Sequence, residues 1–251
     1  MKCEACVGVN GFPIDISMAF QPIVDIEENT IFAHEALVRG PKGEGAAFVF
    51  QQVSELSRYA FDQTCRTKAI ELASGLGIRE QGSYLSINFL PNAVYEPKAC
   101  IKATLSVAEK YQFPLDRIVF EFTEVEQINS DHLLNIMKTY HEIGFKIAID
   151  DFGAGWSGLG LLGLFRPDIV KLDMGLIRNI NDNHALRVIV KHTTAMVADL
   201  NVSLICEGIE TRDEFMVLRD LGVRYMQGYF FARPCFKALS PREDWQDLLD
   251  T

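Results

Sequence analysis

The stretch Lys146-Ile-Ala-Ile-Asp-Asp-Phe-Gly-Ala-Gly155 decides the fold expected for this chain. Its first residues are mostly apolar, which predicts a short buried strand. The strand leads directly into two adjacent carboxylates, Asp150 and Asp151, and the glycines that follow allow the backbone to turn sharply. Adjacent carboxylates repel each other and raise one pKa unless a cation compensates. Because Asp and Gly are also common in solvated turns, the stretch alone leaves a turn and a metal site both open.

The composition limits the possible classes of protein and partner. With 251 residues, 48% of them hydrophobic and 23% charged, the chain resembles an ordinary soluble globular protein. The net charge is −10 without a basic run, which argues against a nucleic-acid duplex or an anionic membrane as partner. No run of about 18 apolar residues is present, and the N-terminus has no apolar stretch of signal-peptide length. We therefore expect no membrane span and a cytoplasmic location.

Six cysteines are scattered along the chain. In a chain of this size they indicate free thiols in a reducing compartment rather than a disulfide framework. Cys3 and Cys6 form a C-x-x-C pattern, but no second pair or histidine cluster follows to complete a zinc site. We predict a short N-terminal tail over residues 1–14 and one domain over residues 15–251.

Strand-like and helix-like segments alternate along this domain. The first two predicted strands are joined by a hairpin-short connection and are therefore expected to be antiparallel. The later alternation predicts a parallel sheet covered by helices, and eight strands in this length favour a TIM-like (β/α)8 barrel with an antiparallel first strand pair. The strands are predicted at 18–25, 31–39, 84–89, 117–124, 146–149, 168–173, 202–207 and 223–230. Amphipathic helical sequence is predicted after the loop at 40–45 and extends to about Gly77, and further helices are predicted at 97–111, 130–144, 183–200 and 211–221, with a terminal helix from Pro241. The helix at 211–221 begins with the capping-box pattern Thr211-Arg-Asp-Glu214.

Polar residues recur where the predicted strands end. In a barrel the carboxyl ends of the strands meet at one face, so these side chains are expected to converge. Each one alone is better explained as a cap or a solvated strand end. Together they form an oxygen-rich set that suits Mg²⁺ or Mn²⁺. His34 is expected on the opposite face of its strand and not as a ligand. The set comprises Glu35, Asn88, Glu121, Asp150, Asp151, Lys171, Asp173, Glu207 and Gln227.

These residues carry a family resemblance. Seven motifs, in order and at consistent spacing, resemble the EAL domain, the family of cyclic di-GMP phosphodiesterases. The resemblance extends roughly from Ala19 to Pro234. The motifs are Glu35-Ala-Leu37 followed by Arg39, Ile87-Asn-Phe89, Glu121-Phe-Thr-Glu124, Asp150-Asp-Phe-Gly-Ala-Gly155, Val170-Lys-Leu-Asp173, Glu207-Gly-Ile-Glu210 and Gln227-Gly-Tyr229.

The resemblance implies a site with two divalent ions, Mg²⁺ or Mn²⁺, on the scissile phosphodiester. One ion is expected on Glu35, Asn88, Glu121 and Asp150. Asp150 is expected to bridge to the second ion, with Asp151 and, directly or through water, Glu207 beside it. The implied catalytic residues are Lys171, which orients the attacking water, Glu207, Gln227, and Glu124, which holds the loop after Asp151. The implied substrate-binding residues are Gln21, Arg39 and Asp173.

The resemblance leaves three functions to weigh. The leading hypothesis is an enzyme that opens cyclic di-GMP to linear pGpG, and the alternative is a catalytically silent cyclic di-GMP receptor that acts through protein contacts. Such receptors typically lose metal ligands, whereas every ligand is present here. An unrelated metal-dependent barrel acting on a small acid is disfavoured by the ordered motifs. The family also implies a homodimer, and regulation is expected through association, a separate regulatory protein or the short N-terminus. At positions 156–158 this chain has Trp-Ser-Gly, where Tyr-Ser-Ser is commoner in the family. The difference concerns the loop after Asp151 and not the implied metal ligands.

Overall fold

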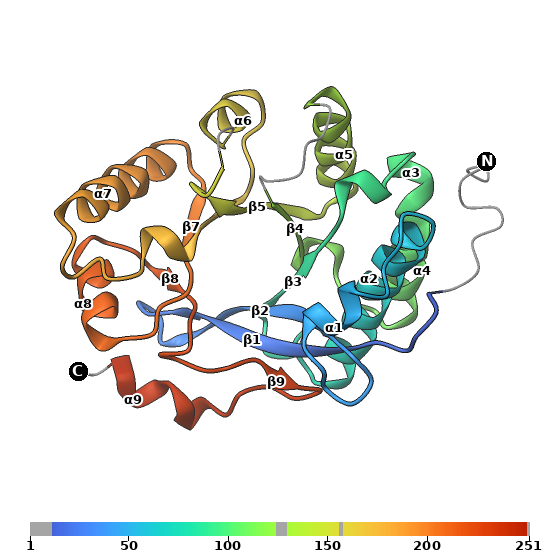
Figure 1. The fold of residues 1–251 in the computed structure, drawn as a ribbon, viewed down its shortest axis with the longest axis horizontal. Helices are drawn as coiled ribbons and strands as arrows, with labels where there is room; N and C mark the ends of the chain where they lie inside the picture. The colour runs from blue at the N-terminus through green and yellow to red at the C-terminus, as the bar shows by residue number, and fades with distance from the viewer. Residues whose placement is uncertain (1–11, 124–129, 156–157, 250–251) are drawn as a thin grey trace.

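The computed structural model describes residues 12–123, 130–155 and 158–249. Eight strands close into a barrel in the order β2-β3-β4-β5-β6-β7-β8-β1, because β1 also pairs with β2 (Figure 1). β1 is antiparallel to its neighbours and the remaining barrel pairs are parallel. The predicted barrel with an antiparallel first pair is confirmed. Its strands are β1 Ser17–Asp25, β2 Thr30–Arg39, β3 Tyr84–Asn88, β4 Ile118–Thr123, β5 Lys146–Phe152, β6 Ile169–Leu172, β7 Ser203–Cys206 and β8 Tyr225–Met226.

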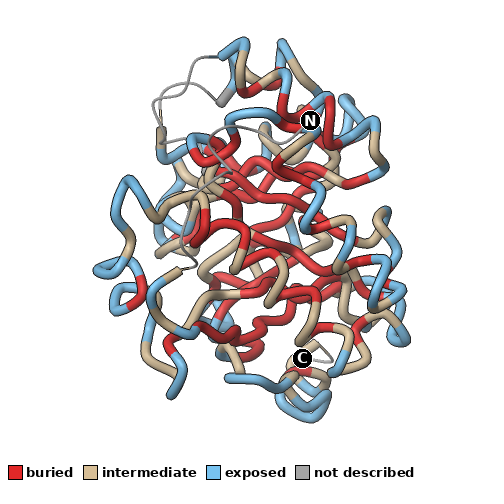
Figure 2. Tube along the Cα trace, turned by 90° about the vertical axis from the view of Figure 1, so that its right-hand side faces the viewer, coloured by how far each residue is buried: buried red, intermediate tan, exposed pale blue. Residues whose placement is uncertain are grey.

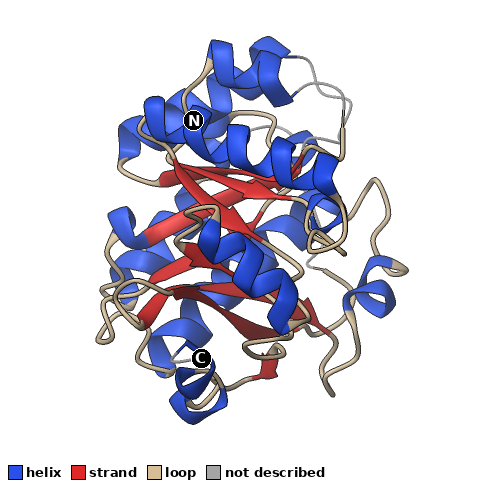
Figure 3. Cartoon of the chain, turned by 90° about the vertical axis from the view of Figure 1, so that its left-hand side faces the viewer, coloured by secondary structure: helices blue, strands red, loops and turns tan. Residues whose placement is uncertain are grey.

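Helices surround the barrel and cover the outer face of its strands (Figures 1 and 3). They are α1 Ala46–Phe50, α2 Arg58–Gly75, α3 Pro97–Cys100, α4 Lys102–Lys110, α5 Ser130–Ile143, α6 Gly158–Leu164, α7 His184–Asp199, α8 Arg212–Asp220 and α9 Gln246–Leu249. Short 3-10 helices cover Pro91–Ala93, Leu115–Arg117, Met174–Leu176 and Arg242–Asp244. Among the described residues, no helix has the length and apolar character needed to cross a membrane.

Sequence signals account for several helix ends. The Asn183 side chain accepts hydrogen bonds from the first turn of α7, and Thr211 and Glu214 form the predicted capping box of α8. The helix predicted at 97–111 is divided into α3 and α4 at Ile101, which keeps helical dihedral angles.

The last predicted strand, 223–230, is shorter in the structure. β8 ends at Met226, and the chain turns at Gly228, where an added Cβ would collide with the backbone of Ile209. The terminal helix begins at Gln246 rather than at Pro241, after a 3-10 turn. A ninth strand that the sequence did not indicate, β9 Cys235–Phe236, pairs with β1.

Buried residues occupy the barrel and the space between its strands and the helices (Figure 2). A separate apolar layer fills the barrel interior, and Phe32, Tyr84 and Tyr225 pack against it. The rings of Phe32 and Tyr225 are stacked, with centroids 4.0 Å apart. The interior layer consists of Ile23, Ala33, Val119, Ala148, Ile169 and Ile205.

Candidate active site at the carboxyl ends of the strands

The interior layer determines where the polar side chains lie. Alternate residues of a strand point to the same face, so the residue two positions after an interior residue also faces the barrel axis. Ala33, Val119, Ala148, Ile169 and Ile205 are each followed in this way by one polar residue at the carboxyl end. These polar residues are Glu35, Glu121, Asp150, Lys171 and Glu207.

Lys171 lies at the centre of these side chains. Its Nζ is 2.5 Å from Glu207 Oε1, 2.9 Å from Glu121 Oε2, 3.4 Å from Asp150 Oδ1 and 3.6 Å from Glu35 Oε2. Burial alone would lower the pKa of Lys171, but the four surrounding carboxylates raise it well above its usual value. The ammonium group therefore stays charged and is within ion-pairing distance of all four carboxylates.

Side-chain amides orient Glu35. Its Oε1 accepts a 2.8 Å hydrogen bond from Asn88 Nδ2, and its Oε2 accepts a 2.7 Å bond from Gln227 Nε2. Gln227 Nε2 also lies 3.3 Å from Gln21 Oε1, and Gln21 is itself anchored through Nε2 to the carbonyl of Ala232. Asn88 here presents its NH₂ group to the carboxylate, so coordination of a cation through its amide oxygen requires this side chain to turn.

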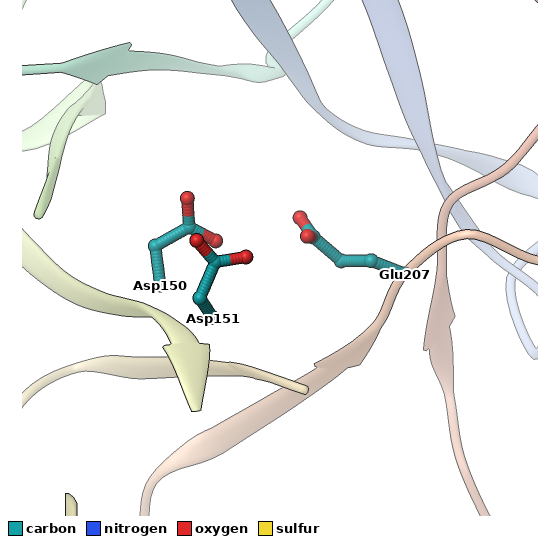
Figure 4. Close-up of side chains that lie close together, drawn as sticks. All are labelled: Asp150, Asp151 and Glu207. Carbon is teal, nitrogen blue, oxygen red and sulfur yellow. The ribbon is translucent and has the colours of Figure 1, made fainter. Parts of the chain in front are cut away.

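Asp150 and Asp151 face the same side although they are adjacent in β5. Consecutive side chains of a regular strand point to opposite faces. Here the β5–β6 register is irregular between Ile149 and Phe152, and Asp151 has a φ of 53°. This irregularity turns Asp151 toward Asp150 and toward Glu207 of the loop after β7 (Figure 4). One oxygen from each of these three carboxylates lies within 4.8 Å of the others.

Several buried carboxylates surround the single ammonium group of Lys171, and this excess of negative charge contributes to the raised pKa values of Glu121 and Asp151. Burial, and then the charges of Glu35 and Asp150, raise the pKa of Glu121 to about 8 against the opposing charge of Lys171. Burial and the neighbouring Asp150 raise the pKa of Asp151 to about 6. For Glu35, burial is outweighed by Lys171 and the two amide donors, which lower its pKa.

The uncompensated charge makes the cluster suitable for metal ions. Asp150 Oδ1 is buried and has no hydrogen-bond partner, although Lys171 lies within ion-pairing distance. Carboxylate and amide oxygens are the ligands that Mg²⁺ and Mn²⁺ prefer. The residues present therefore fit divalent cations.

Two further predicted site residues, Arg39 and Asp173, form hydrogen bonds within their own segments of the chain. Arg39 is half-buried and donates a 2.8 Å hydrogen bond to the neighbouring Val38 carbonyl. Asp173 caps the 3-10 helix at Met174 by accepting a 2.9 Å bond from Gly175 N. The substrate roles of Arg39 and Asp173 remain predictions. Glu124, Cys3 and Cys6 lie outside the described residues, as does the predicted tail up to residue 11.

The structure adds residues that the sequence analysis missed. Ser86 donates a short hydrogen bond to Glu121 Oε1. Strand alternation could have indicated it, because Ser86 lies two residues before Asn88. Arg178 lines a cavity of about 270 Å³ that also borders Glu35 and Gln227. It forms a 2.8 Å ion pair with Glu210. No local pattern marks Arg178, because the fold alone brings it to this cavity.

Comparisons with known proteins give the family. The EAL domain model matches residues 14–234. A standalone EAL protein from Vibrio cholerae O395, solved in its c-di-GMP bound form, is 50% identical with a TM-score of 0.87, covering 91% of this chain and 95% of that one. BlrP1 of Klebsiella pneumoniae, in a manganese and cyclic di-GMP complex, is 32% identical with a TM-score of 0.84, covering 92% and 59%.

Curated proteins are also similar to this chain. The Escherichia coli K12 antirepressor BluF is 29% identical, covering 88% of this chain and 54% of BluF. The probable cyclic di-GMP phosphodiesterase PdeN of the same organism is 30% identical, covering 86% and 43%. This chain thus spans about half the length of these curated relatives. Both the matched family model and the barrel with its ordered motifs place the chain in the EAL domain family.

Proposed function

We propose that this protein is a metal-dependent phosphodiesterase that hydrolyses cyclic di-GMP to linear pGpG and so lowers the level of this second messenger. The observation that carries the proposal is the convergence of Glu35, Asn88, Glu121, Asp150 and Glu207 at one end of the barrel. No residue of the implied metal-binding set is replaced in the sequence. The naming of PdeN as a phosphodiesterase and the cyclic di-GMP in the Vibrio cholerae structure support the same substrate.

The reaction adds one water to one phosphodiester bond. The water oxygen bonds to phosphorus, the bond from phosphorus to the ribose 3′ oxygen breaks, and that oxygen leaves with a proton. Lys171 would orient the attacking water, and its ammonium, buried among the acids, stays charged. Gln227, held between Gln21 and Glu35, would support the water or a phosphate oxygen. Arg39 would bind a phosphate of the substrate.

Divalent cations would be held by Glu35, Asn88, Glu121 and Asp150, with Asp151 and Glu207 beside a second ion. We infer two ions and expect Mg²⁺ or Mn²⁺. When bound, they neutralise the anionic phosphodiester and lower the pKa of the attacking water. The chain requires this contribution because its own carboxylates would otherwise repel the substrate.

Replacement of Glu35 tests the metal-dependent reaction. Glu35→Ala removes a carboxylate that two amides orient, so hydrolysis of cyclic di-GMP with Mg²⁺ or Mn²⁺ should be abolished while the circular dichroism spectrum is retained. Glu27→Ala is the matched control, because Glu27 is an exposed acid in the turn after β1. Ca²⁺ should not replace the smaller ions, since its coordination geometry is less demanding. Full activity in excess EDTA would contradict the metal mechanism.

The silent receptor is separated from the enzyme by measuring binding and turnover on the same sample. Calorimetric titration of cyclic di-GMP, followed by chromatography for pGpG, should show both. Binding without pGpG in the presence of Mg²⁺ or Mn²⁺ would favour the receptor.

We further infer that the protein forms a homodimer in which association affects the rate. Leu159 and Leu164 of α6 have exposed fractions of 68% and 62%, and α6 follows directly on the loop after Asp151. Light scattering coupled to size exclusion should give a dimer that the double substitution Leu159→Ser and Leu164→Ser weakens. A fully active wild-type monomer would contradict this inference.

A further inference from the structure

The side chain of Arg66 on α2 is buried behind the two strands that carry Asn88 and Glu121. Arg66 has no solvent-exposed surface. The NH1 group donates a 2.8 Å hydrogen bond to Tyr140 Oη on α5, and NH2 forms a 2.7 Å ion pair with Asp62 Oδ2. Arg66 therefore connects α2 and α5.

Three aromatic rings surround the guanidinium group. Its central carbon lies 5.1 Å from the ring centroid of Phe120, 5.2 Å from that of Phe89 and 5.6 Å from that of Tyr140. At these distances the ring faces attract a cation, and they do so more strongly when water is excluded. The positive charge of Arg66 is thus stabilised by the three rings and by Asp62.

Two of these rings adjoin predicted metal ligands in the chain. Phe89 directly follows Asn88, and Phe120 directly precedes Glu121. Neighbouring residues of a strand point to opposite faces, so Phe120 lies on the outer face of β4 beside Arg66 while Glu121 faces inward. Phe89, the first residue after β3, packs against Phe120 on the same outer side. Phe89 N also donates a 2.9 Å hydrogen bond to the carbonyl of Glu121, which couples the two ligand segments.

Asp62 adds a second attachment from the same helix. Its Oδ1 accepts a 2.9 Å hydrogen bond from the backbone nitrogen of Leu90, two residues after Asn88. Asp62, through Leu90, and Arg66, through Phe89, thereby both contact the segment that leaves β3. A buried ion pair is weak evidence for a gain in stability, because apolar replacements of similar volume often stabilise as well. Arg66 Nε moreover has no hydrogen-bond partner.

We propose that Arg66 is a positioning residue that holds the Asn88 and Glu121 segments at the separation needed for metal binding. The inference rests on the proposed function in taking Asn88 and Glu121 as ligands. Residues that orient ligands without touching the ion commonly affect metal affinity, and their replacement lowers it by about 10- to 100-fold.

The test measures Mn²⁺ affinity on the purified full chain by electron paramagnetic resonance, which needs no turnover. The double variant Asp62→Asn and Arg66→Met removes both charges together and retains an acceptor for Leu90 N. It should show a cooperative thermal transition and bind Mn²⁺ roughly 10-fold or more weakly than wild type. The single variant Arg66→Lys keeps a positive charge beside Asp62, so it should bind Mn²⁺ more tightly than the double variant and more weakly than wild type. Tyr140→Phe, which removes one hydrogen bond, should weaken binding slightly and serves as the decisive variant if the double variant does not fold.

Arg224→Met is the matched control. Arg224 pairs with Asp25 at 2.7 Å near the opposite end of the strands, so its loss should lower stability and leave Mn²⁺ affinity unchanged. Wild-type affinity in a folded double variant, or in Tyr140→Phe where the double variant does not fold, would overturn the proposal. A wild type that binds Mn²⁺ without hydrolysing cyclic di-GMP would instead contradict the proposed function and leave the role of Arg66 testable.

Discussion

At the scale of single residues, Lys171 shows how one side chain can serve both structure and chemistry. It is fully buried, and its Nζ lies within 3.6 Å of four carboxylates, which is what a purely structural ion-pair role also requires. The two roles differ once metal ions compensate the acids. A structural lysine then becomes dispensable, whereas a lysine that orients water does not.

Lys171→Ala therefore distinguishes these roles when it is assayed at saturating Mn²⁺ or Mg²⁺. Loss of water positioning harms the transition state more than ground-state binding, so kcat should fall on the order of 10²-fold, or about 3 kcal/mol, while cyclic di-GMP affinity is nearly kept. Lys146→Ala is the matched control, because Lys146 pairs with Asp168 at 2.8 Å where β5 begins. Equal loss of affinity with an unchanged kcat would assign Lys171 to substrate binding or structure.

At the scale of elements, Glu214 connects the start of α8 to the loop that precedes it and to the segment before α7. Its carboxylate accepts hydrogen bonds from the backbone nitrogens of Asn179, Glu210 and Thr211, at 3.0, 3.0 and 3.1 Å. Burial would raise the pKa of Glu214, but these donors outweigh it and lower the pKa. This one residue fixes the loop after Glu207 as well as the start of α8.

The lowered pKa of Glu214 predicts a pH-dependent contribution to stability. The unfolded chain takes up the proton at a higher pH than the folded chain, so the contribution is complete above the unfolded pKa near 4.5 and is lost as the pH falls through the folded pKa. Glu214→Gln should lower the free energy of unfolding by about 1–2 kcal/mol at pH 7. Urea titrations should show a smaller difference from wild type at pH 3.5. The exposed Glu142→Gln is the control, and a difference that grows on acidification would contradict the prediction.

At the scale of the whole molecule, the closed barrel concentrates negative charge at one end. Acids that are far apart in the unfolded chain meet there, so folding brings together groups that repel each other. A divalent cation held by these acids would bind the folded chain in preference to the unfolded one, because the carboxylates converge only in the folded chain. Metal binding should therefore increase stability.

Thermal unfolding with and without MnCl₂ measures this linkage. At a concentration 100 times the dissociation constant, binding stabilises by about 2.7 kcal/mol, which should raise Tm by several degrees. Asp150→Asn should abolish the rise, and Asp168→Asn, outside the acid cluster, should retain it. Equal Tm values for wild type with and without Mn²⁺ would show that the carboxylates do not form a metal site.

Local pattern was sufficient for the barrel, for the order of its eight strands and for the set of polar residues that converge at one end. Alternating strand and helix signals predicted the barrel, a short connection predicted the antiparallel first pair, and the repeated position of acids after apolar strands predicted which residues converge. The alternation of side chains along a strand is a local property, so Glu35, Glu121 and Asp150 could be assigned to one face before any contact was known. Thr211 and Glu214 were likewise predicted to cap α8.

Only the tertiary structure decided how the charges are shared and what supports them. The sequence did not indicate β9, because its two residues become a strand only by pairing with β1. Nor did it indicate that Lys171 contacts four acids, three on strands and one just after β7, or that Arg66 lies between Phe89 and Phe120. These contacts join residues far apart in the chain, and their energies depend on burial and on the closeness of several groups at once. Periodicity reports the face on which a side chain lies, whereas the partners it meets there are set by closure of the barrel.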